Sequence, residues 1–138
     1  AVETLVARLF PLATVVTPNL PEAEALVGAG PKRELAARLV ELGARAAIVT
    51  GGHGDPVDHL FDGEQHVEIP VERVESGATH GAGCTHSATL AALLARGLSL
   101  EDAARGAAEA ASLAVAQGLA DIGKGDGPVD VLGLPGAA

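Results

Sequence analysis

The sequence predicts an α/β domain with a mainly parallel sheet between layers of helices. Two observations support this fold class. Segments with apolar residues at helical spacing alternate with short β-branched runs. Polar or glycine-rich loops also follow these runs and lead into helices, which is typical of the carboxyl ends of strands in layered α/β proteins. We therefore expect an α/β/α sandwich whose binding site lies at the loops.

In the first half of the chain, helices and strands are expected to alternate. Pro21 stands at a helix start, acidic residues follow it and Gly28 ends the pattern. Pro31 opens a further amphipathic segment that Gly43 closes. A wholly apolar run of strand length then stops at two glycines, as in a strand covered on both faces. The expected elements are helices over 2–10, 21–27 and 31–42 and strands over 13–17 and 46–50.

In the second half, the sequence predicts a hairpin followed by two long helices. Asp62-Gly63 is a hairpin turn signal between partly alternating runs over 57–62 and 64–71. Two Ala-rich helices are expected over 84–97 and 100–120, and Ser99 is a good N-cap for the second. The glycine-rich tail is expected to be a loop.

Composition limits the functions that the chain can have. Its 138 residues, 48% of them hydrophobic, fit one globular domain, and a net charge of −9 with scattered basic residues argues against nucleic-acid binding. A single cysteine excludes an internal disulfide and fits a reducing compartment. No long apolar run and no leader is present, so we expect no membrane association and a cytoplasmic location.

The only cysteine, Cys84, follows glycines at the expected start of a helix. If the helix begins near Gly83, the amides of residues 83–86 converge and the helix dipole adds positive potential, which suits a phosphate. The same field favours the thiolate, so Cys84 is a candidate proton acceptor or nucleophile. A free cysteine can equally be a small buried apolar residue. His80 or His86 within reach of the thiol would make a Cys/His nucleophile an alternative.

Asn19 and Glu22 form a second candidate site on a loop that leads into a helix. An Asn and a carboxylate three residues apart can hold a hydrated Mg²⁺ together. Alternatively, Asn19 is a turn residue and Glu22 complements the helix dipole, which the residues alone favour.

A third candidate is the loop Gly51-Gly52-His53, which follows the apolar run 46–50. Glycines without a Cβ allow close approach of phosphates, although a tight turn would need them too. The five histidines show no spacing typical of zinc sites, and no Walker A motif is present.

Four segments together resemble a known family: VVTPNLPEAEALVG, TGGHGDPVDHLFDG, THGAGCTHSATLAALLARG and IGKGDGPVD. In this order and at these separations they resemble hydroxymethylpyrimidine/phosphomethylpyrimidine kinase, a thiamine-biosynthesis enzyme of the ribokinase-like superfamily. The most specific segment is the glycine loop, where this group carries Cys and sugar-phosphorylating relatives carry Asp. The resemblance implies a ribokinase-like fold, ATP and Mg²⁺ as cofactors, and phosphorylation of hydroxymethylpyrimidine and then of its monophosphate.

The resemblance also implies a role for each candidate residue. Cys84 would be the base for the substrate hydroxyl, and Gly81 and Gly83 would form the anion hole for the transferring phosphoryl group. Asn19 and Glu22 match the family's N-x-x-E pattern that supports Mg²⁺. The residues expected near the nucleotide are Thr50, Gly51, Gly52, His53 and Lys124.

The family's chain is longer than this one. The match begins partway through it, so the resemblance implies that residues 1–138 are a single partial kinase domain, the C-terminal half. We expect a small pyrimidine as substrate, and either a homo-oligomer or association with the missing N-terminal half. The alternatives are a pyridoxal-type kinase, a non-catalytic nucleotide-binding module and, more remotely, a Cys/His hydrolase.

Overall fold

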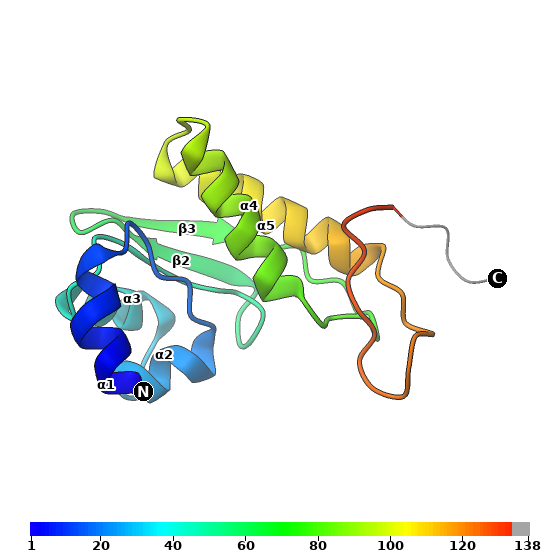
Figure 1. The fold of residues 1–138 in the computed structure, drawn as a ribbon, viewed down its shortest axis with the longest axis horizontal. Helices are drawn as coiled ribbons and strands as arrows, with labels where there is room; N and C mark the ends of the chain where they lie inside the picture. The colour runs from blue at the N-terminus through cyan, green and yellow to red at the C-terminus, as the bar shows by residue number, and fades with distance from the viewer. Residues whose placement is uncertain (134–138) are drawn as a thin grey trace. The chain divides into compact units, whose positions relative to one another are not determined.

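The computed structural model of the chain describes residues 1–133 (Figure 1). The chain divides into two compact units, Ala1–Val71 and Glu72–Ala138, and each is described by itself. Within residues 1–133, no helix combines the length and the apolar character needed to cross a membrane.

Helical segments make up much of the first unit. The expected helix over 2–10 is a continuous helical run with three geometries, and its last turn contains Pro11 and buries Phe10. The expected helices over 21–27 and 31–42 are confirmed to within two residues at each end. The segments are α1 (Val2–Thr4), the π-helical η1 (Leu5–Leu9), the 3-10 helix η2 (Phe10–Leu12), α2 (Leu20–Val27) and α3 (Lys32–Glu41).

The sheet of the first unit is antiparallel, which differs from the mainly parallel sheet that we expected. Strands β1 (Ala47–Val49), β2 (Val57–Phe61) and β3 (His66–Pro70) pair in the order β1-β2-β3. The hairpin between β2 and β3 is confirmed, and its turn is held by Asp62, whose Oδ1 accepts the backbone N–H groups of Glu64 and Gln65. These two bonds lower the pKa of Asp62.

Parallel pairing occurs in the first unit only as one isolated bridge, between Val16 and Ala47. Val16 donates to Ala46 O at 3.0 Å and accepts from Ile48 N at 2.8 Å. Thr50 N donates to Pro18 O at 3.1 Å. Pro18 has no N–H to return a bond, so the expected strand over 13–17 is reduced to this bridge beside β1.

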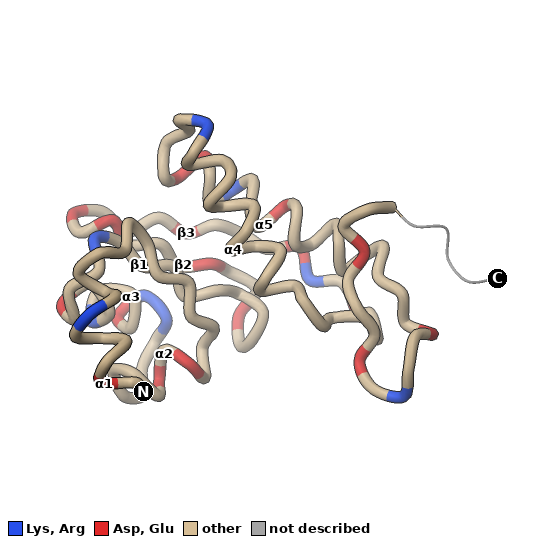
Figure 2. The backbone as a smooth tube through the Cα atoms, in the orientation of Figure 1, with Lys and Arg blue, Asp and Glu red and all other residues tan. Residues whose placement is uncertain are grey.

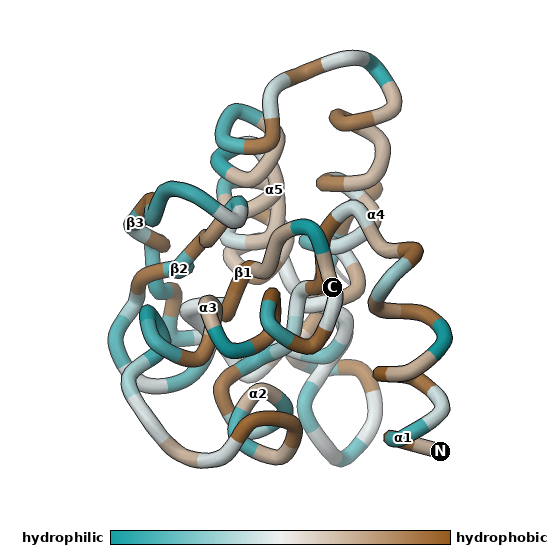
Figure 3. The backbone as a smooth tube through the Cα atoms, turned by 90° about the vertical axis from the view of Figure 1, so that its left-hand side faces the viewer, coloured by the Kyte–Doolittle hydropathy of each residue, from teal (hydrophilic) through white to brown (hydrophobic). Residues whose placement is uncertain are grey.

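The core of the first unit lies between α2, α3 and the sheet. Strand β1 is wholly buried and falls on the hydrophobic side of the colour scale in Figure 3. Helix α3 packs against β1, β2 and α2. The buried core residues are Phe10, Ala23, Leu35, Ala36, Leu39, Ala44, Ala47 and Val49.

The second unit is built on two long antiparallel helices, α4 (Ala82–Ala95) and α5 (Leu100–Ala116), which pack along each other. The buried positions of α5 are all alanines, and Gly106 lies so close to α4 that a Cβ there would be 2.7 Å from Cδ1 of Leu93. Ser99 is the expected N-cap of α5: its Oγ accepts from Asp102 N at 3.1 Å. Helix α5 ends four residues earlier than expected.

Charged residues are distributed along both units. Acidic positions outnumber basic ones two to one, and the Lys and Arg positions are scattered rather than gathered in a run (Figure 2).

Candidate functional site

Asn19 and Glu22 lie together at the start of α2. Asn19 Oδ1 accepts from Glu22 N at 2.9 Å, and Glu22 Oε2 accepts from Asn19 N at 3.0 Å. This is a capping box, which satisfies two backbone donors at the helix start. Within residues 1–133 no hydrogen bond is seen at the other carboxylate oxygen of Glu22, Oε1, and the residue is exposed.

The loop Gly51-Gly52-His53 lies near this capping box. Thr50, just before the loop, pairs with Pro18, just before Asn19, so both loops leave the sheet at neighbouring carboxyl ends. A Cβ added to Gly54 would lie 3.4 Å from Cδ2 of Leu20, at the start of α2. The first unit therefore brings together the two sequence motifs that we assigned to metal and nucleotide.

The space around the backbone differs between Gly51 and Gly52. A Cβ at Gly51 would lie 2.8 Å from Val57 N, so the backbone itself fills that space. A Cβ at Gly52 would meet nothing within 4 Å, and Gly52 and His53 are exposed. The backbone at Gly52 is thus uncrowded on its Cβ side, while Gly51 closes the turn.

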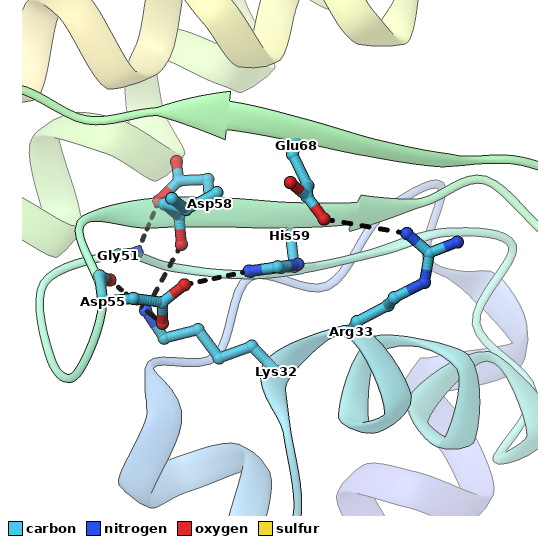
Figure 4. A network of polar contacts seen from close by, with 8 residues as sticks. Lys32, Arg33, Gly51, Asp55, Asp58, His59 and Glu68 are labelled. Atoms are coloured by element: carbon cyan, nitrogen blue, oxygen red, sulfur yellow. Dashed lines mark hydrogen bonds and ion pairs between the residues drawn. The ribbon is translucent and has the colours of Figure 1, made fainter.

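The side chains that hold this loop were not predicted from the sequence. Asp58 is 2% exposed, and its Oδ1 accepts from Gly51 N at 2.5 Å (Figure 4). The Lys32 ammonium lies 3.0 Å from Asp55 Oδ1 and 2.6 Å from Asp55 O. Its hydrogen bond is the main cause that lowers the pKa of Asp55, and the hydrogen bond from His59 Nε2 to Asp55 Oδ2, at 3.2 Å, adds to the effect. Both contacts stabilise the ionised form of the Asp55 carboxylate.

The glycine loop and the start of α4 carry the candidate residues of the second unit. Gly81 is the N-cap with φ 94°, a left-handed conformation that favours glycine, and Cys84 is exposed in the first turn. The helix begins at Ala82, two residues before the start of the expected helix over 84–97. Because Thr85 N already donates to Gly81 O at 2.9 Å, our expectation of convergent amides over 83–86 is wrong for its second half.

The amides that remain at this helix start are those of Gly83 and Cys84, which intrahelical bonds do not reach. A Cβ at Gly83 would meet nothing within 4 Å, so a phosphate can approach it closely. The N-terminal end of a helix 14 residues long also provides positive potential at this point.

The tail loop with Lys124 begins and ends beside the glycine loop. His80 N donates to Gly127 O at 3.1 Å, and Gly127 N donates to Gly77 O at 2.7 Å. His80 also forms an isolated parallel bridge with Pro128. Lys124 lies in the exposed part of this loop. The second unit therefore brings the Cys84 and Lys124 motifs into one neighbourhood.

Two features of the residues present suit Mg²⁺ and the phosphates of ATP. Mg²⁺ is commonly held by one or two carboxylates, substrate phosphates and waters, and Glu22 Oε1 offers such a ligand. A Cβ would meet nothing within 4 Å at Gly52 in the first unit or at Gly83 in the second, so neither backbone position is crowded. Within residues 1–133, no three His, Cys, Asp or Glu side chains gather to hold a metal by themselves.

Comparison with known proteins places the chain in a family. The profile of the phosphomethylpyrimidine kinase family matches residues 1–130. The chain belongs to this family. The resemblance of the four sequence segments to hydroxymethylpyrimidine/phosphomethylpyrimidine kinase is thereby confirmed.

Curated relatives agree with the family assignment. The chain is 46% identical over 140 residues to the thiamine biosynthesis bifunctional protein ThiED of Geobacter sulfurreducens, covering 94% of this chain and 28% of the relative. It is 43% identical over 141 residues to the hydroxymethylpyrimidine/phosphomethylpyrimidine kinase of Rhizobium meliloti, covering 94% of this chain and 52% of that kinase. The chain therefore spans about half, or less, of the length of these relatives.

Several solved structures have a similar fold. The Staphylococcus aureus pyridoxal kinase in complex with AMP-PCP and pyridoxal matches with a TM-score of 0.87 and 33% identity, over 94% of this chain and 52% of that chain. The ADP complex of Bacillus subtilis pyridoxal kinase matches with a TM-score of 0.83 and 36% identity, over 93% and 51%. A pyrophosphate-dependent kinase in the ribokinase family, at 21% identity and a TM-score of 0.72 over 94% of this chain and 43% of that chain, shares the fold. The α/β class that we predicted is consistent with these neighbours.

Proposed function

We propose that the natural protein containing this chain is an ATP-dependent hydroxymethylpyrimidine and phosphomethylpyrimidine kinase of thiamine biosynthesis. The observation that carries the proposal is the exposed Cys84 in the first turn of α4, after the left-handed Gly81, in a chain whose residues 1–130 match this kinase family. The chain would be the C-terminal half of one kinase domain and carry its nucleotide and catalytic loops.

Phosphoryl transfer requires positioning and charge stabilisation more than covalent catalysis, and the loops provide for both. When bound, ATP supplies the phosphoryl group and Mg²⁺ offsets its charge. Cys84 accepts the proton of the substrate hydroxyl. The amides of Gly83 and Cys84 stabilise negative charge that develops on the phosphoryl oxygens.

The remaining candidate residues bind and orient the cofactors in this proposal. Glu22 contributes Oε1 to the metal and its waters, and Asn19 holds Glu22 through the capping box. Gly52 and His53 lie closest to the nucleotide, while Thr50 and Gly51 shape the loop before them. Lys124 contributes a positive charge from the tail loop.

Assembly and location also belong to the proposal. We expect the layered α/β/α fold with a mainly parallel sheet to be completed by the N-terminal half that the relatives carry, with the bridge at Val16 as the parallel neighbour of β1. We expect the protein to act in the cytoplasm, on a small pyrimidine and without nucleic acid. It would function either as a homo-oligomer or through association with that N-terminal half.

A pyridoxal kinase is the second candidate function. It is favoured by the high structural similarity to pyridoxal kinases, with a TM-score of 0.87 for the complex with AMP-PCP and pyridoxal. A non-catalytic nucleotide-binding module would retain the glycine loops and lack turnover.

The deciding experiment is product detection by mass spectrometry. The full-length natural protein is incubated with Mg-ATP and either hydroxymethylpyrimidine or pyridoxal, and the 138-residue chain is assayed in parallel. Mono- and diphosphates of the pyrimidine are expected. Phosphorylation of pyridoxal alone would replace the pyrimidine assignment with the second candidate, and nucleotide binding without any product would support the non-catalytic module.

A further inference from the structure

Lys32 occupies a position that is unfavourable for a lysine. Its side chain is 3% exposed, and burial of an ammonium group costs free energy unless the group is paired and hydrogen-bonded. Lys32 is also the first residue of α3, where the helix dipole disfavours a positive charge. Contacts elsewhere in the first unit must therefore offset both costs.

The Lys32 ammonium makes those contacts with one loop, the segment 51–57 between β1 and β2 (Figure 4). It donates to Asp55 O at 2.6 Å and to Val57 O at 3.3 Å, and it lies 3.0 Å from Asp55 Oδ1. A Cβ at Gly54 would lie 3.7 Å from Cε of Lys32, so the loop also packs on the lysine stem. Each residue that Lys32 contacts here is more than 20 residues away from it in the sequence.

The other end of loop 51–57 is fixed by Asp58. This buried carboxylate accepts from Gly51 N, while Val57 N donates to Asp55 O at 2.9 Å. The loop is thus held at its first residue and again at residues 55 and 57. The exposed residues Gly52 and His53 project between these two anchors.

We propose that Lys32 is a positioning residue that holds loop 51–57 in the conformation in which the amide of Gly52 meets the nucleotide phosphates. The proposal rests on the proposed function of this loop in ATP binding. Lys32 acts through Asp55 and Val57, and it makes no contact with substrate itself. A loop ordered before binding loses less conformational entropy when the nucleotide binds, so Lys32 contributes to affinity for ATP.

The test replaces Lys32 with Met, which keeps the stem and removes the ammonium, in the full-length natural protein. Arg33→Met is the matched control, because Arg33 is the next residue of α3, is exposed, and pairs only loosely with Glu68 at 3.7 Å. The apparent KM for ATP and the Kd for AMP-PCP are expected to rise about tenfold in Lys32→Met, with kcat and the KM for the pyrimidine within about twofold.

A rise in the KM for ATP without a rise in the KM for the pyrimidine would distinguish a positioning role from a structural one. A purely structural role would lower the fraction of active protein, and hence kcat, without a selective change in the KM for ATP. Asp55→Asn keeps the backbone acceptors of the ammonium and is expected to raise the KM for ATP by a smaller factor. This variant replaces Lys32→Met in the test if Lys32→Met does not fold. An unchanged Kd for AMP-PCP in Lys32→Met overturns the inference. If Lys32→Met does not fold, an unchanged Kd in Asp55→Asn overturns it.

The same measurements separate this inference from the proposed function. If the natural protein phosphorylates neither pyrimidine nor pyridoxal but Lys32→Met still weakens AMP-PCP binding, the positioning role stands and the kinase assignment fails. If the natural protein is an active kinase and Lys32→Met matches Arg33→Met, the assignment stands and the inference fails. A natural protein that binds no nucleotide overturns both.

Discussion

At the scale of single residues, Cys84 is the group on which the proposed reaction depends. Its side chain is exposed in the first turn of α4, beside the open amide of Gly83. A proton acceptor contributes to the chemical step rather than to nucleotide affinity.

Replacement of Cys84 by Ala is therefore expected to lower kcat by about a hundredfold to ten-thousandfold. The Kd for AMP-PCP should remain within about twofold, since the backbone amides are kept. Steady-state kinetics and calorimetry on the full-length protein check this. Ser87→Ala, one turn further along α4, is the control and should keep wild-type turnover; an active Cys84→Ala protein would rule out the cysteine as the base.

Asn19 caps helix α2, and this structural role does not depend on whether Asn19 also supports Mg²⁺. Asn19→Ala removes the acceptor for Glu22 N and is expected to destabilise the protein by about 1 kcal/mol. Asn19→Asp keeps the acceptor and should lose much less. Urea denaturation at pH 7 measures both, and equal stability of Asn19→Ala and wild type would contradict the capping role.

At the scale of elements, the β2-β3 hairpin carries a titrating group. The ring of His66 stacks on Phe61 with centroids 4.3 Å apart, and its buried Nδ1 has no hydrogen-bond partner among the described residues. Burial lowers the pKa of His66, and the nearby Arg33 and His59 lower it further, while Asp62 opposes them.

A lowered histidine pKa makes the hairpin sensitive to acid. The unfolded chain takes up the His66 proton as pH falls through about 6.5, before the folded chain does, so stability decreases from there downward. His66→Phe keeps the stacked ring and cannot ionise. Its free energy of unfolding is expected to fall less than that of wild type between pH 7.5 and 5.5 in urea titrations, and identical losses would exclude His66 as the source.

Elements with local signals were predictable from the sequence, whereas pairing between distant segments was not. The helix start at Pro21, the Asp62-Gly63 turn and the Ser99 cap act over three or four residues, and each is confirmed. The capping box of Asn19 and Glu22 was not predicted. The direction of the sheet depends on which distant segments pair, and β1 pairs with the hairpin rather than forming a parallel ladder over 13–17.

The site residues that the sequence indicated stay predictions, and their placement in the fold was only partly foreseen. The sequence motifs identified Asn19, the glycine loop and Cys84, whereas Lys32 and Asp58 were missed. A lysine after a proline at a helix start is typical of a solvated surface, and only the folded chain places it 2.6 Å from Asp55 O. The one available signal was the unfavourable position of a cation at a helix N-terminus.

At the scale of the whole chain, the net charge of −9 bears on the proposed binding of ATP. A polyanionic nucleotide is repelled by an acidic protein unless a cation accompanies it. Binding of Mg-ATP should therefore stabilise the folded protein, while free ATP should not.

Thermal unfolding of the full-length protein tests this dependence. Mg-ATP at about 100 times its Kd is expected to stabilise the folded state by about 2.7 kcal/mol and to raise Tm by several degrees. ATP with excess EDTA should give no rise, and Mg²⁺ alone is the control. An equal rise with ATP and EDTA would show that the nucleotide binds without the metal.

The capping box affects which residues can distinguish active from inactive members of this family. Asn19 and Glu22 stabilise α2 through mutual bonds, so selection for a folded chain alone would retain them in a copy that no longer phosphorylates anything. The exposed Cys84 lies in the helix turn without taking part in its cap. If Cys84 is the proposed base, no capping role would preserve it in a copy without activity, so its presence would mark an active copy better than the N-x-x-E pattern does.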